Sequence, residues 1–273
     1  TVRWFEQHGI QLKAEPDGRM FPISNTSQTI IDCLLNEATK HHIDLSLNTE
    51  VTDIKIIKDQ FNLTLKNHLS INADYIMIAT GGFPKPEQYH WLKSFGHHII
   101  EPVPSLFTFN TPSSSLKQLM GVVAEQAIVK IEGSKLVEQG PVLITHWGLS
   151  GPAILRLSAW GARELYENKY HFNVIVNWLG KPENEVRDKW NEIRNKQGSN
   201  VISVKNPYGI ANRLWDFFLH ECQIAPNTKW SELASKDQNK LIHILTTHCI
   251  AVEGKTTFKE EFVTCGGIDL QEI

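Results

Sequence analysis

Residues 73–82 read ADYIMIATGG, an apolar run that follows an acidic residue and ends in a hydroxyl and two glycines. The apolar residues 75–79 show no alternation, which is typical of a strand covered on both faces, as in a parallel sheet. Because glycine has no Cβ, the ending Thr80-Gly81-Gly82 predicts a place where a ligand approaches the backbone closely. Ligands of open α/β sheets bind at the carboxyl ends of strands, and this is such an end.

The residues before this run predict a helix, a strand and an antiparallel meander. Polar cap candidates at 24–26 precede apolar residues at helical spacing, which indicates a helix that continues to about residue 42. A short strand is expected over 43–47. Three β-rich runs, VTDIKIIKD, FNLTLK and LSINA, are separated by polar pairs and predict the meander.

The residues after it change character twice. From Pro84 to about Gly151 the chain is rich in short β runs punctuated by glycine and proline, as in a small barrel or sandwich. A helix over 152–165 and a strand over 171–179 follow. Helical periodicity then extends over 181–253, with aromatic side chains at core spacing, and the last residues return to strand.

Composition limits the function classes. The chain has 273 residues and a formal charge of −3, so its composition shows no excess of basic residues for binding nucleic acid or an anionic membrane. No apolar stretch approaches the roughly 20 residues that span a bilayer. Four cysteines lack CxxC spacing and predict free thiols in a reducing compartment, by default the cytoplasm. The chain begins without methionine and stops where a strand is under way, so we expect a fragment.

Five motifs occur in a fixed order along the chain: GRMFP (18–22), ATGG (79–82), PVPSL (102–106), THWGLSGP (145–152) and VTCGGI (263–268). Together they resemble the bacterial NAD(P)/FAD-dependent oxidoreductase family that includes bile-acid reductase-like and aminoacetone oxidase-like flavoproteins. The resemblance runs from about residue 17 to the end, and THWGLSGP is its most specific motif.

The resemblance implies an α/β (mixed α+β) fold in which a partial Rossmann-like FAD-binding domain is interrupted by β-barrel-like and helical subdomains. The expected parts are residues 1–104 and 257–273 for the FAD-binding domain, 105–180 for the barrel-like part and 181–256 for the helical insert. It also implies noncovalent FAD, a nicotinamide (NAD(P)H) or oxygen as redox partner, and a small organic substrate.

Two departures from the family pattern lower the expected affinity for FAD. Residues 85–90 (KPEQYH) replace a second turn rich in Gly, Ser or Thr, and no glycines here have the GxGxxG spacing of a phosphate-binding turn. We therefore expect the chain as given to bind FAD weakly.

The cofactor-binding candidates are glycines at strand ends and the polar or apolar residues beside them: Arg19, Val51, Thr80, Gly81, Gly82, Thr264, Gly266 and Gly267. The arginine offers a planar fork for a phosphate or carboxylate. By resemblance Val51 meets the adenine through its backbone. His146 is the candidate for a catalytic proton donor or substrate-orienting group, because histidine titrates near neutral pH.

Other functions remain as alternatives. Gly148-Leu149-Ser150-Gly151 misses the second glycine of a serine-hydrolase elbow by one place, which disfavours a hydrolase. Cys265 has no basic neighbour in sequence and is interpreted as a small filler, and the histidines lack the spacing of a zinc site, so no metal is expected. The barrel-like and helical parts could also form a non-catalytic interaction module.

Overall fold

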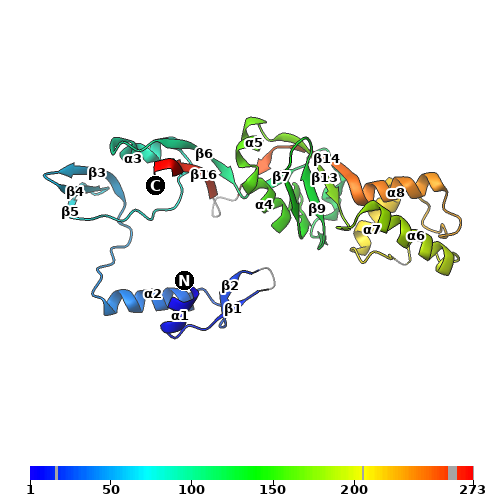
Figure 1. Cartoon of the computed structure of the whole chain (residues 1–273), viewed down its shortest axis with the longest axis horizontal. Coiled ribbons are helices and arrows are strands. Elements are labelled where there is room, and N and C mark those ends of the chain that lie inside the picture. The colour runs from blue at the N-terminus through cyan, green and yellow to red at the C-terminus, as the bar shows by residue number, and fades with distance from the viewer. Residues whose placement is uncertain (16–17, 205, 258–262, 273) are drawn as a thin grey trace. The chain divides into compact units, whose positions relative to one another are not determined.

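The computed structural model describes residues 1–15, 18–204, 206–257 and 263–272, and the chain divides after Ile78 into two units (Figure 1). The first unit, Thr1–Ile78, contains these elements: α1 (Val2–Gln7), β1 (Leu12–Ala14), β2 (Met20–Pro22), α2 (Gln28–Lys40), β3 (Val51–Ile57), β4 (Gln60–Leu65) and β5 (Ser70–Ala73). None of the described helices is long and apolar enough to cross a membrane.

The meander of the first unit is confirmed. Strands β3, β4 and β5 pair antiparallel in that order. The β3–β4 turn places Lys58 and Asp59 at φ of 52° and 63°, and two successive residues at positive φ match the right-handed twist of a tight hairpin. The helix predicted before it is also confirmed as α2.

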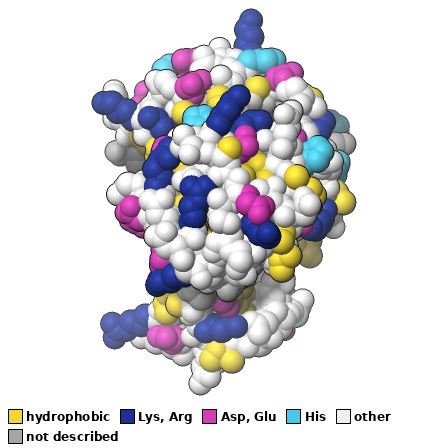
Figure 2. Space-filling model, turned by 90° about the vertical axis from the view of Figure 1, so that its right-hand side faces the viewer, with side chains coloured by type: hydrophobic (Ala, Val, Ile, Leu, Met, Phe, Trp, Pro, Cys, Tyr) yellow, Lys and Arg dark blue, Asp and Glu magenta, His cyan; other side chains and the backbone are white. Residues whose placement is uncertain are grey.

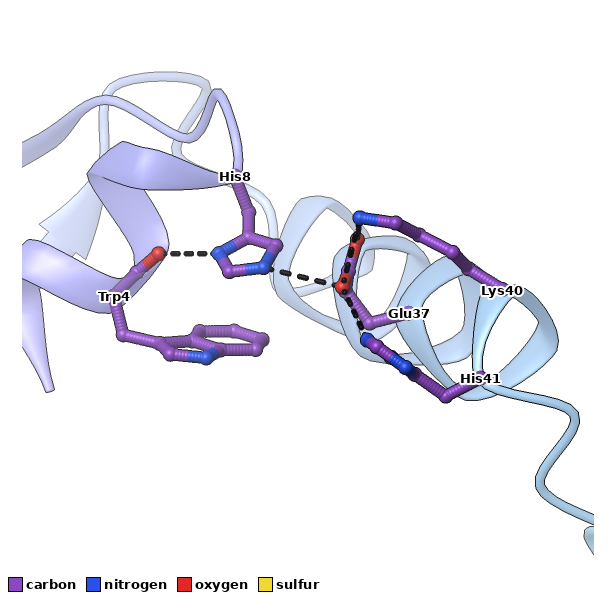
Figure 3. A network of polar contacts seen from close by, with 5 residues as sticks. All are labelled: Trp4, His8, Glu37, Lys40 and His41. Atoms are coloured by element: carbon purple, nitrogen blue, oxygen red, sulfur yellow. Dashed lines mark hydrogen bonds and ion pairs between the residues drawn. The ribbon is translucent and has the colours of Figure 1, made fainter.

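A cluster of polar contacts joins α1 to α2 (Figure 3). The His8 ring stacks on Trp4, with centroids 4.1 Å apart, and its Nδ1 donates to the Trp4 carbonyl over 2.7 Å. Its Nε2 lies 3.1 Å from the Glu37 carboxylate, which Lys40 and His41 also approach, at 3.3 Å and 3.5 Å. Both ring nitrogens of His8 therefore face oxygen atoms, one from each helix.

Two predicted strands of the first unit were wrong. Residues 43–47 form no strand, and residues 75–79 are extended without a paired neighbour among the described strands. Tyr75 and Met77 are 91% and 93% exposed and Ile78 is 41% exposed, so the run is not the buried strand that was predicted. A strand forms only where a neighbour takes up its N–H and C=O groups, and apolar composition alone supplies no such neighbour.

The second unit, Ala79–Ile273, begins with two short helical turns and a series of short strands. Its first half contains η1 (Pro86–Tyr89), α3 (His90–Ser94), β6 (Ile99–Ser105), β7 (Thr108–Asn110), η2 (Ser115–Leu119), β8 (Val123–Ala124), β9 (Ile128–Ile131), β10 (Val137–Gln139), β11 (Val142–Ile144) and β12 (Gly148–Ser150). The predicted β-rich region is therefore confirmed.

Its second half contains α4 (Pro152–Trp160), α5 (Ala162–Glu167), β13 (His171–Asn177), α6 (Glu183–Gln197), α7 (Asn212–Glu221), α8 (Ser235–Thr247), β14 (His248–Glu253), β15 (Lys255–Thr256), β16 (Val263–Ile268) and η3 (Leu270–Glu272). The strands form a five-stranded sheet, β15-β7-β12-β11-β8, a four-stranded sheet, β10-β9-β13-β14, and the pair β16-β6. Figure 1 shows α6, α7 and α8 together beside the four-stranded sheet.

The hydrophobic core lies in the second unit and continues from the sheets into the helices. Trp190 of α6, Trp215 of α7 and the loop residue Trp230 are fully buried against one another, with centroid distances of 4.7 Å and 6.2 Å to Trp230. Aromatic side chains bury large apolar areas, so this cluster fixes the helical insert.

The predicted C-terminal boundary of the helical segment 181–253 was wrong. Residues 248–253 continue the insert in sequence, but they form β14, which pairs antiparallel with β13 from His171↔Glu253 to Val176↔His248. Ile250 and Val252 are buried while their neighbours face outward, which is the period of a strand. The mixed α+β class is thus confirmed, whereas every pairing between the described strands is antiparallel and no Rossmann-like parallel sheet is present among them.

Candidate functional site

The structure brings together two of the predicted glycine segments, which lie far apart in sequence. A Cβ placed on Gly82 would lie 2.4 Å from Oγ1 of Thr264, so the end of the ATGG segment rests directly on β16. Strand β16 is held in turn by β6, with Thr264 opposite Pro104, and the register shifts between Cys265 and Gly267. Within this strand Gly266 is exposed, whereas Gly267 is buried.

Tyr89 fixes the residues that follow Gly82. Its buried side chain comes from η1, and its hydroxyl accepts from the Phe83 N–H over 2.9 Å and lies 3.3 Å from the Phe83 carbonyl. The two rings meet edge to face at 5.2 Å. A Cβ on Gly267 would lie 3.8 Å from the Tyr89 ring. The Tyr89 side chain therefore contacts both the residue that follows ATGG and the VTCGGI strand.

Arg163 reaches the same strand from the first turn of α5. Its Nη2 donates to the Cys265 carbonyl over 3.2 Å. Gly266 has a φ of +132°, and a Cβ there would lie 2.9 Å from Arg163 Nη2 and 2.7 Å from the Glu101 carbonyl oxygen. Only a glycine fits at this position without displacing the guanidinium or the strand.

These contacts decide how well the segment suits a nucleotide. Gly82 and Gly266 are glycines because the chain's own atoms occupy the place of a side chain. Gly81 is different: it is exposed, has a φ of +72°, and has nothing within 4 Å of its Cβ position. Gly81 and Gly266 are both exposed, so a flat cofactor can approach their N–H and C=O groups, but at Gly266 the guanidinium of Arg163 lies beside the main chain.

The remaining cofactor candidates are not gathered at this junction. Thr80 is exposed, and its hydroxyl lies 3.5 Å from the Gly81 carbonyl. Arg19 and Val51 belong to the first unit. The Arg19 guanidinium lies 5.6 Å from the centroid of the Phe21 ring, and Val51 begins β3, paired with Leu65 and 41% exposed.

His146 lies in a hairpin turn. The turn joins β11 to β12 and is closed by the Thr145 N–H and hydroxyl on the Gly148 carbonyl, at 2.7 Å and 3.1 Å. The exposed His146 ring contacts that of Trp147, with centroids 3.8 Å apart. Ser150 sits in β12 opposite Leu143, and within the described residues no histidine is hydrogen-bonded to it, which leaves the hydrolase alternative without support.

Metal chemistry has no support in the part of the chain that the structure describes. It contains no group of three or more His, Cys, Asp or Glu side chains that could hold a metal ion. All four cysteines are free thiols, and Cys265 is partly buried.

A cavity of about 420 Å³ lies on the helical insert and is lined by Leu179, Lys181, Glu185, Asp188, Lys189, Glu192, Pro207 and Tyr208. It lies on other elements than the glycine segments. Figure 2 looks onto the end of the molecule that carries this insert and shows Lys and Arg side chains interspersed with Asp and Glu. That face therefore carries no large patch of one charge.

Sequence reasoning missed Tyr89 and Arg163. Tyr89 lies in the segment that departs from the family pattern, and Arg163 lies in a helical stretch where an arginine is normally a solvated surface residue. No local signal distinguishes either one, because both act through contacts with residues distant in sequence.

Comparison with curated proteins finds similar chains over nearly the whole length. The chain is 27% identical over 281 residues to the ribosomal RNA dihydrouridine synthase of Escherichia coli (strain K12), covering 98% of this chain and 66% of the relative. It is 22% identical over 282 residues to the 3-dehydro-bile acid delta(4,6)-reductase of Clostridium scindens, covering 100% and 68%. It is also 22% identical over 280 residues to the ribosomal RNA dihydrouridine synthase of Haemophilus influenzae, covering 98% and 66%.

The chain thus spans about two thirds of the length of these relatives. A family model described as the HI0933-like protein barrel and H2TH domain matches residues 103–263, which is more than half of the chain. These residues include the short strands from β7 to β15, the helices α4 to α8, and the end of β6. The chain belongs to the HI0933-like family.

Proposed function

We propose that the protein, in its natural length, is an FAD-dependent oxidoreductase that reduces a small organic substrate. The observation that carries the proposal is the meeting of Gly82 with Thr264 at the bulge before Gly267, because it assembles one bare backbone surface from two glycine segments. FAD bound there would supply the hydride transfer between a nicotinamide, or oxygen, and the substrate.

The names of the relatives suggest a class of substrate. One relative is named for the synthesis of dihydrouridine and another as a delta(4,6)-reductase, and both names denote reduction of a carbon–carbon double bond. In the reaction that we propose, a hydride would add to one carbon of the double bond and a proton to the other. We therefore favour a substrate with an activated alkene.

The chain's own residues would bind and orient the cofactor. Gly81 and Gly266 would present main-chain groups at the surface, with Thr80, Gly82, Thr264 and Gly267 beside them. We keep Arg19 and Val51 as candidates for cofactor contacts from the first unit. In this proposal residues 1–104 and 257–273 form the FAD-binding domain, 105–180 the barrel-like part and 181–256 the helical insert.

His146 remains our candidate for donating or orienting the proton, since its ring is exposed in a turn and free to meet a ligand. We expect His146→Ala to lower the rate of substrate reduction roughly 10²-fold or more, as for loss of a general acid. His220→Ala, at an exposed position on α7, is the control. Equal rates for both variants would remove His146 from the proposal.

Bound flavin tests the proposal directly. We expect the protein purified in its natural length to show the flavin absorbance bands, to release FAD on acid precipitation, and to be bleached by NADH or NADPH without oxygen. A colourless protein that takes up no FAD in an equilibrium titration contradicts the proposal. That outcome favours the alternative that the barrel and helical insert form a non-catalytic interaction module.

We propose a small-molecule substrate and no nucleic-acid partner, although two relatives are named for ribosomal RNA. The chain has a formal charge of −3, and the face in Figure 2 mixes both signs, whereas nucleic-acid surfaces are strongly basic. Gel-shift titration with ribosomal RNA fragments at low salt tests this: tight, salt-dependent binding would make RNA the substrate class.

A further inference from the structure

Arg163 carries a positive charge that has no ion-pair partner among the residues that the structure describes. Its guanidinium has five N–H donors, of which one is used on the neutral Cys265 carbonyl, at 3.2 Å. Within the described residues no carboxylate lies within 4.0 Å of it, in contrast to Arg156 and Arg187, which pair with Glu138 and Glu183 at 3.0 Å and 2.7 Å. The side chain is partly buried, where an unpaired cation is costly.

The guanidinium of Arg163 lies close to the proposed cofactor surface at Gly266. Helix α5 packs on β6, and β6 pairs with β16, so the Arg163 side chain emerges over the bulge of β16. Gly266 is exposed there, and its missing side chain is what allows the guanidinium to lie against the main chain. Thr264, one residue before Cys265, touches Gly82. The charge thus stands at the junction of both glycine segments.

We infer that Arg163 is an oxyanion-binding residue, which holds a phosphate or carboxylate group of a ligand at the junction of Gly82 with Thr264–Gly267. The inference rests on the proposed function for the identity of that ligand. A planar guanidinium binds either anion through two parallel N–H···O bonds, a geometry that lysine does not offer. The oxyanion belongs either to the pyrophosphate of the cofactor or to a carboxylate on the substrate.

A purely structural role is the competing explanation, in which Arg163 only ties α5 to β16. Arg213 supplies a matched control, because its Nη2 also donates to one carbonyl over 3.2 Å, that of Gln118, but from an exposed position on α7 in the helical insert. A structural tie predicts that Arg163→Met changes the melting temperature without changing the affinity for anions.

The test is calorimetric titration of wild type, Arg163→Met, Arg163→Lys and Arg213→Met with inorganic pyrophosphate, benzoate and riboflavin. We expect Arg163→Met to weaken pyrophosphate or benzoate binding about tenfold, which corresponds to the loss of one charge-assisted contact. Arg163→Lys should lose part of the affinity because it keeps the charge and loses the fork. Arg213→Met should match wild type, and riboflavin, which has no phosphate, should bind all four proteins equally.

The outcomes distinguish cofactor pyrophosphate from a substrate carboxylate as the source of the anion. They also distinguish failure of the anion site at Arg163 from failure of the proposed flavin-dependent function. Loss confined to pyrophosphate assigns Arg163 to the cofactor, and loss confined to benzoate assigns it to the substrate. Wild type that binds neither anion, or Arg163→Met that binds both as wild type does, overturns the inference. If Arg163→Met fails to fold, Arg163→Lys decides in the same way. A protein that binds pyrophosphate through Arg163 but no riboflavin contradicts the flavin proposal alone.

Discussion

The indole Nε1 of Trp178 donates to Nδ1 of His248 over 3.1 Å, which joins the end of β13 to the first residue of β14. Because Nδ1 accepts this bond, the imidazole is neutral and carries its proton on Nε2. Burial lowers the pKa of His248 to about 4, and the charge of His243 acts in the same direction. The place where the chain leaves the helical insert and rejoins the sheet thus depends on an uncharged histidine.

This arrangement predicts a loss of stability in mild acid. The folded pKa of His248 lies below its ordinary value of 6.5, so its contribution is complete above pH 6.5 and is lost as the pH falls toward about 4. The unfolded chain binds a proton that the folded protein does not, and the free energy of unfolding should fall by at most about 3 kcal/mol. Urea unfolding at a series of pH values measures it.

The variant His248→Asn is the control for that series. Its amide oxygen can accept the Trp178 bond but does not titrate, so the pH dependence between 6.5 and about 4 should be shallower than in wild type. Curves with the same slope for both proteins would assign the acid sensitivity to other groups.

Gly148 should be among the least replaceable residues of the barrel. Its φ is +153°, and a Cβ there would lie 2.2 Å from the Phe109 carbonyl oxygen, which belongs to the paired strand and cannot move aside. We expect Gly148→Ala to lower the free energy of unfolding by about 3 kcal/mol or more. Gly121→Ala, at a φ of +86° with nothing within 4 Å, should cost about 1–2 kcal/mol from backbone strain alone. Equal urea midpoints for the two would contradict this packing.

The contact between Gly82 and Thr264 predicts an interaction in a double-mutant cycle. Gly82→Ala should cost roughly 1–2 kcal/mol, because its Cβ would lie 2.4 Å from the Thr264 hydroxyl. Thr264→Ala removes that hydroxyl, so the double variant should recover about 1 kcal/mol relative to the sum of the single changes. Additive free energies from urea unfolding would show that the two segments do not touch in solution.

Glu37 should control the attachment of α1 to α2. Partial loss of water raises the pKa of its carboxyl, but the hydrogen bond from Lys40 and the charges of His8, Lys40 and His41 outweigh this and leave the pKa below its usual value of 4.5. The carboxylate therefore contributes above pH 4.5, and its contribution is lost as the pH falls through the lowered pKa.

Replacing Glu37 by Gln should increase amide hydrogen exchange in α1 without changing exchange in β3 to β5, because the acceptor of the His8 Nε2 loses its negative charge. Glu6→Gln removes an exposed carboxylate on α1 and serves as the control. Unchanged protection of the α1 amides in Glu37→Gln would show that the Trp4 and His8 stacking holds the helix by itself.

The local sequence pattern was sufficient to predict the helices and strands whose contacts are near in sequence. Helix α2 follows from apolar spacing, and the β3-β4-β5 meander follows from β-rich runs that pair with their immediate neighbours. The return to strand at the end of the chain is also seen, as β16, which the VTCGGI motif forms. In each case the sequence period and turn residues carry the information, because the contacts close over a few residues.

Tertiary structure decided what depends on a distant partner. The run 75–79 has the apolarity of a covered strand, yet no described strand pairs with it, and residues 248–253 became a strand because β13 offers them a ladder. The contact of Gly82 with Thr264 joins segments from opposite ends of the second unit, and the position of Arg163 over Gly266 joins its middle to its end. Hydrogen bonds and steric fit between remote segments leave no periodic trace in sequence, so only the folded chain reveals them.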